Sequence, residues 1–236
     1  MALPAILTII LITGLLALDA YWPRFSLFGK TLSRGRSSGG KVIALTFDDG
    51  PSAPATARIL EVLERFGVKA TFFMLGANCV RHPDLVRRVQ AAGHVIGNHT
   101  FSHRKLVFAG PQTILDEITQ WEEVVGDAPL PGPKLFRAPH GFKNPWLPTV
   151  LKRKGYHLIG WTRGIWDTDD GVDPDLLFRR ATKNIRPGEV LLLHDGKDTS
   201  LNPDRSATVA VLPRLIEFYR QAGYRFVTIP EILKTS

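Results

Sequence analysis

Residues 42–51 read VIALTFDDGP, an apolar run that ends in two adjacent carboxylates, Asp48 and Asp49, and a glycine-proline turn. Side chains alternate faces along a β-strand, so a strand that ends here offers one carboxylate to a metal ion and leaves the other free as a base. A turn that only caps a buried strand is the competing interpretation of these residues. Three later segments bear on the choice.

The chain from residue 42 onward alternates short apolar, β-branched runs with amphipathic stretches, which is typical of βα units on a mainly parallel sheet. Apolar residues recur with helical spacing from Ile59 to Phe66, and Gly67 ends that stretch. Further helices are expected at 83–92, 113–125, 175–184 and 209–222. Seven strands are expected, beginning near Val42, Ala70, His94, Lys134, His157, Glu189 and Arg225. We predict an α/β fold, a deformed seven-stranded (β/α) barrel with its active groups at the C-terminal strand ends.

Residues 1–18 carry no charged side chain and are just long enough to cross a bilayer. A signal peptide cleaved after Ala20 is the alternative, but Leu18 stands where such a site favours a small residue, and a positively charged start is missing. We expect residues 1–22 to be a single-pass membrane anchor, with the catalytic domain outside the cytoplasm, or a signal segment if it is cleaved. The positive-inside rule favours the opposite orientation, so the orientation stays open.

The net charge of +8 is concentrated beside this apolar segment, because residues 22–41 hold five basic side chains and no acidic one. We expect residues 23–40 to be a basic juxtamembrane linker that faces anionic headgroups, and residues 41–236 to be the catalytic domain. No basic stripe with interleaved aromatic residues is present, so no nucleic-acid partner is expected. Cys79 is the only cysteine, which excludes an intrachain disulfide.

The second informative segment is HTFSH at residues 99–103, which follows an expected strand. Two imidazoles four residues apart can face the same way on a tight loop, and imidazole suits zinc and neighbouring divalent metals. His99, His103 and one aspartate would make a three-ligand set that leaves a position open for water. A pair of surface histidines is the alternative.

Two more segments place reactive side chains at expected strand ends. His194 ends EVLLLH at residues 189–194, where it could give a proton to a departing amine; a third metal ligand or a histidine bonded to Asp195 are the alternatives. KLFRAPHG at residues 134–141 puts Arg137 before a tight turn. Arg137 could hold a carboxylate bidentately and orient a catalytic base, while the turn's N–H groups could face an oxyanion.

These segments resemble the NodB-like polysaccharide deacetylases, metal-dependent carbohydrate esterases, across nearly the whole of residues 42–236. TFDDGP, HTFSH, RAPHG and LLLHD are similar to four of the five family motifs and occur in the family's order. The resemblance implies that Asp48 is the general base and His194 the general acid. It further implies that Asp49, His99 and His103 hold one divalent metal ion, with zinc expected and cobalt, manganese or nickel as alternatives.

The resemblance also implies supporting roles near the reaction centre. Arg137 would position the base, and Leu192 would form an apolar wall around the acetyl methyl group. A backbone N–H of the turn, that of His140, would contribute to the oxyanion hole. His140 departs from the family pattern, which usually has an aromatic residue, often tyrosine, at this position.

The remaining family motif, commonly Asp-Trp, is degenerate, because Asp167 is followed by Thr168 in GWTRGIWDTDD. We choose Asp167 as the partner of Arg137. Trp161 or Trp166 could replace the missing tryptophan in the acetate pocket, and we assign Trp166 to substrate binding.

The predicted function is therefore metal-dependent hydrolysis of N-acetyl groups from N-acetylglucosamine-containing polysaccharide or oligosaccharide, such as peptidoglycan or a chitin-like glycan. Two alternatives are a deacylase of a lipid-linked sugar at the membrane surface and a catalytically silent glycan-binding module. The expected partners are an N-acetylated glycan and, through the N-terminal segment, a membrane.

Overall fold

The computed structural model describes residues 14, 30–35, 40–126 and 132–234. The expected membrane anchor therefore lies, apart from Gly14, outside the described residues. Within the part of the chain that is described, no helix combines the length and the apolar character needed to cross a membrane.

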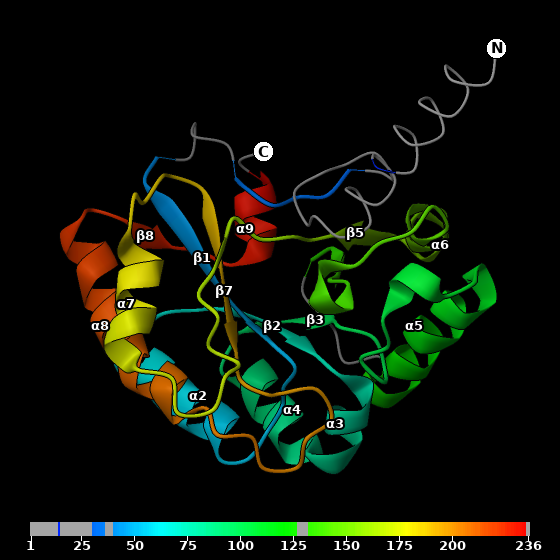
Figure 1. Ribbon diagram of the computed structural model, residues 1–236, viewed down its shortest axis with the longest axis horizontal. Coiled ribbons are helices and arrows are strands. Elements are labelled where there is room, and N and C mark those ends of the chain that lie inside the picture. Colours follow the sequence, from blue (N-terminus) through cyan, green and yellow to red (C-terminus); the bar gives the residue numbers. More distant parts are fainter. Residues whose placement is uncertain (1–13, 15–29, 36–39, 127–131, 235–236) are drawn as a thin grey trace.

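A curled sheet of parallel strands forms the centre of the molecule (Figure 1). Its strands are β1 (Val42–Asp48), β2 (Thr71–Met74), β3 (Val95–Asn98), β4 (Lys134–Phe136), β5 (Tyr156–Leu158), β6 (Arg163–Gly164), β7 (Glu189–His194) and β8 (Arg225–Phe226). The order is β5-β4-β3-β2-β1-β7-β6, and β8 pairs with the first residues of β1. All seven expected strands are confirmed, and the two-residue strand β6 is additional. The predicted fold, a deformed α/β barrel, is confirmed as well, and the barrel is open.

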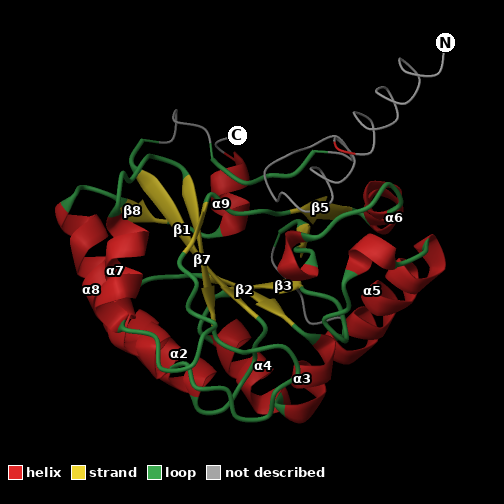
Figure 2. Ribbon diagram, viewed as in Figure 1, coloured by secondary structure: helices red, strands yellow, loops and turns green. Residues whose placement is uncertain are grey.

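Helices form an outer arc around the strands (Figure 2). They are α2 (Ala55–Arg65), α3 (Gly76–Arg81), α4 (Pro83–Ala91), α5 (Pro111–Val125), α6 (Leu147–Lys154), α7 (Pro174–Thr182), α8 (Ser206–Gln221) and α9 (Ile229–Lys234), with short 3-10 turns η2 (Leu106–Phe108) and η3 (Pro139–Gly141). The five helices expected from periodicity are confirmed as α2, α4, α5, α7 and α8. Periodicity did not reveal α3, α6 and α9, which span eight residues or fewer.

Strand β1 separates two hydrophobic clusters by the alternation of its side chains. Ile43, Leu45 and Phe47 join the cluster that includes residues of α2 and α8, whereas Val42 and Ala44 join the cluster inside the curled sheet. This alternation puts residues 46 and 48 on the inner face as well, which carries Asp48 to the inner end of the barrel.

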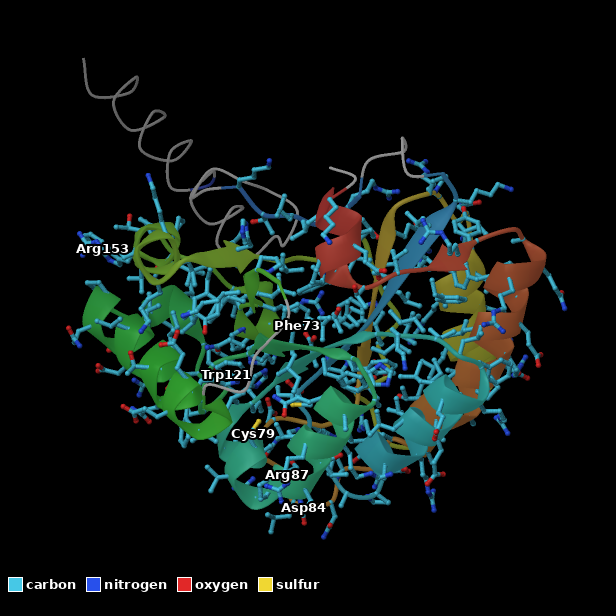
Figure 3. All side chains as sticks on the ribbon, turned by 180° about the vertical axis from the view of Figure 1, so that it is seen from behind. Phe73, Cys79, Asp84, Arg87, Trp121 and Arg153 are labelled. Carbon is cyan, nitrogen blue, oxygen red and sulfur yellow. The ribbon has the colours of Figure 1, made fainter. Side chains whose placement is uncertain are left out.

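The inside of the barrel is filled rather than hollow. Phe73 lies near the centre of the molecule, whereas Asp84 and Arg87 lie at its outer edge (Figure 3). A Cβ atom added to Gly97 on β3 would stand 2.6 Å from the Phe73 ring, so the neighbouring strand must carry glycine here. Ile229 and Ile232 of α9 pack into the same inner cluster.

The start of the described chain differs from the expected linker. Leu32 donates its N–H to the Leu158 carbonyl and accepts from the Gly160 N–H, both about 3 Å away, while the Gly35 N–H donates to the Gly188 carbonyl. The Leu32 side chain packs against the inner cluster. Residues 31–35 therefore belong to the folded domain and run from the end of β5 to the start of β7.

Candidate active site

Asp48 and Asp49 both face one site, and strand alternation is not what separates them. Asp48 ends β1, but Asp49 has a φ angle of 72°, so the backbone turns sharply between the two carboxylates. The His99 Nε2 atom lies 3.7 Å from Asp48 Oδ2 and 3.3 Å from Asp49 Oδ1. The expectation that the two acids point to opposite faces is thus wrong, because the turn returns Asp49 to the same side.

The turn after Asp49 is fixed by its contact with the end of β7. A Cβ atom on Gly50 would stand 2.1 Å from the Asp195 carboxylate, and one on Gly196 would stand 2.2 Å from the Asp49 carbonyl oxygen. Thr56 Oγ1 donates to Asp195 Oδ2 across 2.7 Å. The two glycines therefore allow the strand ends to approach closely enough to form one site.

His99 and His103 present matching ring nitrogens to Asp49. The His103 Nε2 atom lies 3.1 Å from Asp49 Oδ1, and the His99 Nε2 atom lies 3.3 Å from it. The His99 Nδ1–H donates to the Arg137 carbonyl oxygen across 2.8 Å, so the Nε2 lone pair faces the carboxylate.

The three side chains fit a divalent cation. One ligand atom from each of Asp49, His99 and His103 lies within 4.8 Å of the other two, and all three groups are buried. The buried Asp49 Oδ1 atom has no hydrogen-bond partner. A carboxylate oxygen and two imidazole nitrogens form the usual protein donor set for a catalytic metal with an open position.

Arg137 is fully buried beneath Asp48. Its Nη1 atom lies 2.6 Å from Asp48 Oδ1 and 2.8 Å from Thr46 Oγ1, and Nη2 donates to the Gly160 carbonyl. The guanidinium also lies 4.0 Å from the centre of the Phe73 ring. Arg137 thus orients Asp48 as expected, but through one nitrogen rather than a bidentate pair.

The expected pairing of Asp167 with Arg137 is wrong. Asp167 Oδ1 accepts from His194 Nδ1–H across 2.7 Å, and Oδ2 accepts from the His194 backbone N–H across 2.9 Å. Thr208 Oγ1 donates to the same Oδ2 atom. Asp167 therefore fixes the tautomer and direction of His194, whose Nε2 atom is left for the site.

The site lowers the pKa of Asp49 and raises that of His194, so the charged form of each group is favoured. Burial opposes the charged form of Asp49, but the neighbouring His103 and His99 rings hold its pKa well below the usual range. Burial alone would lower the pKa of His194, yet the Asp167 carboxylate raises it to about 9. At neutral pH without metal, His194 is therefore protonated and able to act as an acid.

The residues expected to touch substrate lie in three different settings. Leu192 is buried two residues before His194 on β7. The centre of the exposed His140 ring lies 4.6 Å from that of His103, with the two rings tilted by 54°. Trp161 approaches Arg137 and shares the surroundings of Gly164 with Leu192. Trp166 is 71% exposed, so a role in a closed acetate pocket suits Trp161 better.

Sequence reasoning missed three residues that support the site. Arg205 is buried and donates to the Asp167 and Thr168 carbonyl groups, and Thr208 binds the Asp167 carboxylate. Asp198 pairs with His103 Nδ1. No spacing signal identifies them, because their roles depend on how the chain folds after β7.

The loops of the site hold unusual backbone conformations. Six non-glycine residues there have positive φ angles, namely Asp49, Thr100, His103, His140, Trp166 and Asp198. Such conformations are costly and persist only where surrounding contacts impose them, which is typical of functional sites.

Comparison with known proteins agrees with this arrangement. The family model described as polysaccharide deacetylase matches residues 35–159, which is more than half of the chain. The chain belongs to the polysaccharide deacetylase family. As a polysaccharide deacetylase it is a hydrolase that acts on amides, and its open barrel is the family's fold.

Several relatives of this deacetylase are similar over most of their length. A peptidoglycan-N-acetylglucosamine deacetylase of Bacillus cereus is 35% identical over 198 residues, covering 82% of this chain and 89% of the relative. A chitooligosaccharide deacetylase of Bradyrhizobium sp. is 32% identical over 218 residues, covering 87% and 97%. The crystal structure of the Bc1960 peptidoglycan N-acetylglucosamine deacetylase superposes with a TM-score of 0.77 at 33% identity, covering 87% of this chain and 94% of that one.

Proposed function

We propose that this deacetylase removes acetyl groups from N-acetylglucosamine units of peptidoglycan or of chitin-like oligosaccharides. The observation that supports this most is the pairing of β1 with β7, in which Asp48 stands directly beside His194. A base and an acid thus lie next to each other at one strand end, with the Asp49, His99 and His103 cluster beside them. The names of the similar enzymes supply the substrate class.

Asp48 and His194 carry out the two proton transfers of the reaction. A divalent cation at the Asp49 cluster would polarise the amide carbonyl and make water more acidic. Asp48, held by Arg137, takes the proton from the attacking water. The His140 N–H stabilises the developing oxyanion, while His194 gives its proton to the departing amine. The products are acetate and a free amino sugar.

Four further residues prepare the site for the reaction and for the substrate. Asp167 holds His194 protonated and directs its Nε2 atom into the site. Leu192 and Trp161 supply apolar surface for the acetyl methyl group. Trp166, being largely exposed, is suited to stack on a sugar ring.

We propose zinc as the metal, because two imidazoles and one carboxylate are donors that zinc accepts readily. Metal analysis of protein purified without added metal tests this proposal. Zinc near one equivalent is the expected result, and a different metal at one equivalent would contradict it.

We also propose that residues 1–22 anchor the enzyme in a membrane, with the catalytic domain outside the cytoplasm. The apolar, uncharged run at residues 1–18 supports this. Topology reporters fused after Ser236 test it, and a cytoplasmic signal would direct attention to lipid-linked precursors instead of wall glycan.

The decisive test of the function replaces Asp48 with Asn and measures acetate release from peptidoglycan and from chitin oligomers. The Asn side chain keeps the size of Asp48 but cannot take a proton, so kcat should fall by about 10²- to 10⁴-fold. Metal content should stay at the wild-type level, because Asp48 is outside the three-residue cluster. Wild-type turnover in this variant would overturn the assignment of the base, and a wild-type enzyme that binds metal but releases no acetate would favour a glycan-binding module.

A further inference from the structure

Asp198 makes contacts to two members of the Asp49, His99 and His103 cluster. Its carboxylate pairs with His103 Nδ1, and its backbone N–H donates to Asp49 Oδ2 across 3.1 Å. Asp198 follows the end of β7 by four residues and has a φ angle of 47°, a strained conformation for a residue other than glycine. These contacts go beyond the four motifs that define the site.

The contact between Asp198 and His103 Nδ1 resembles the hydrogen bond that His99 Nδ1 makes with the Arg137 carbonyl. In His99 the Nδ1–H donates to a backbone carbonyl, and Nε2 is left to face Asp49. In His103 the partner of Nδ1 is the Asp198 carboxylate, and Nε2 again faces Asp49. A carboxylate that accepts from one ring nitrogen fixes the tautomer of a histidine and strengthens its other nitrogen as a metal ligand.

The loop around Asp198 is held in place by α3. Asn78 Nδ2 donates to the Asp49 carbonyl across 2.7 Å and to the Asp198 carbonyl across 3.0 Å. Arg81 Nη1 bonds to Asn78 Oδ1 across 2.9 Å and to the Thr199 carbonyl across 2.7 Å. Asp198 is thus located by several independent hydrogen bonds, although its carboxylate is 59% exposed.

We propose that Asp198 is a positioning residue that orients His103 and thereby sets the affinity of the metal site. The proposal rests on the proposed deacetylase function, because it assumes that Asp49, His99 and His103 bind a divalent cation. Asp198 acts through His103 and Asp49, and it makes no contact with the reacting atoms.

The test measures zinc affinity of the full-length, metal-free protein by competition with a chromophoric chelator. Asp198→Ala removes the acceptor and the charge, so zinc should bind about 10- to 100-fold more weakly. Asp198→Asn keeps an oxygen that accepts from His103 Nδ1–H but loses the charge, so its affinity should lie between those of the wild type and the alanine variant. Melting curves without metal should coincide for the wild type and Asp198→Asn, because the changed side chain is largely exposed and asparagine, like aspartate, tolerates the positive φ angle.

Asp204→Asn is the matched control. Asp204 lies in the same loop, and its carboxylate accepts from the Ser206 N–H at the start of α8 across 2.9 Å, so the same chemical change there should leave zinc affinity unaltered. Zinc affinity of Asp198→Ala within twofold of the wild type would overturn the proposal.

The number of zinc ions bound per protein chain distinguishes two further outcomes. His103, His140 and Asp198 could themselves surround a cation on the Nδ1 side of His103. Two zinc equivalents in the wild type and one in Asp198→Ala would make Asp198 a ligand and overturn its positioning role. A wild type that binds no zinc or other divalent metal would instead overturn the proposed function, whatever the variants do.

Discussion

Asp48 and Asp49 have identical side chains and adjacent positions, yet their surroundings suit them to different chemistry. The Arg137 guanidinium lies against Asp48, whereas His99 and His103 surround Asp49. A carboxylate held by one cation keeps an oxygen free to take a proton, and a carboxylate between two imidazoles completes a set of metal ligands. Neighbouring residues, rather than residue type, therefore determine the role of each acid.

The charge of Asp167 should control the protonation of His194. Burial lowers the pKa of His194, but Asp167 raises it to about 9 in the metal-free protein. Asp167→Asn keeps an oxygen that accepts from Nδ1–H and removes the charge, so the pKa should fall towards the ordinary value of histidine. An NMR titration of the ring in metal-free protein measures this shift, and Asp169→Asn, a change to an exposed neighbour, is the control.

The same pKa sets the direction of a stability change with pH. Because the folded-state pKa is raised, protonated His194 stabilises the fold fully below its ordinary pKa of about 6.5. This contribution is lost as the pH rises through about 9. The difference in unfolding free energy between the wild type and Asp167→Asn should therefore shrink over that interval, and parallel pH profiles would contradict the assignment.

Among the elements, the β1 turn should be the least tolerant of added volume. Gly50→Ala would place a Cβ atom 2.1 Å from the Asp195 carboxylate, which Thr56 holds in place. The clash should cost about 1–3 kcal/mol of unfolding free energy and shift Asp48 and Asp49. Denaturant unfolding and acetate release measure the two effects.

Gly110→Ala is the control for that prediction. Gly110 precedes α5 with a φ angle of −73°, and a Cβ atom there would meet no atom within 4 Å. Only a small change at the helix N-cap is expected, with acetate release unaltered. Equal losses in the two variants would show that the turn has no special sensitivity.

How far sequence predicts these elements depends on their length. The apolar runs of β1 and β7 and the periodic faces of α2 and α8 are long enough for their spacing to identify them. Strand β6 has two residues and α3 has six, so neither shows a full period. Tertiary contacts, not local pattern, specify such short elements.

The residues of the site also fall into those that local sequence motifs identify and those that only tertiary contacts specify. Motifs that end strands, such as HTFSH and LLLHD, were located correctly because parallel strands bring their C-terminal ends together. The partner of Asp167 was missed because it depends on the path of the chain between β6 and α7, which leads Asp167 to His194. Asp198 and Thr208 were missed for a similar reason, since the loop and helix after β7 bring them back to the site.

At the scale of the whole molecule, the edge strand β5 and the inner strand β7 do not pair with each other among the described residues. Residues 31–35 bond to the end of β5 and to the chain just before β7. Leu32 adds apolar contact with the cluster inside the barrel. The segment before β1 thus links parts of the sheet that do not pair with each other.

A chain beginning at residue 40 should therefore be less stable than one beginning at residue 30. The cut removes three backbone hydrogen bonds, those between Leu32 and Leu158, Leu32 and Gly160, and Gly35 and Gly188. Each contributes about 0.5–1.5 kcal/mol, and burial of Leu32 adds to them. Thermal unfolding of the two proteins measures the loss. Equal melting temperatures would mean that residues 31–35 contribute nothing to the fold.

The left-handed backbone at six positions around the site has a consequence for heat resistance. Each such residue costs about 1–3 kcal/mol, and Thr100 is the most unusual because its side chain is β-branched. Glycine would relieve the cost, and asparagine part of it. A laboratory selection for survival at high temperature, applied without a demand for deacetylation, should therefore collect glycine and asparagine at these positions. The resulting proteins would be thermostable and poor catalysts.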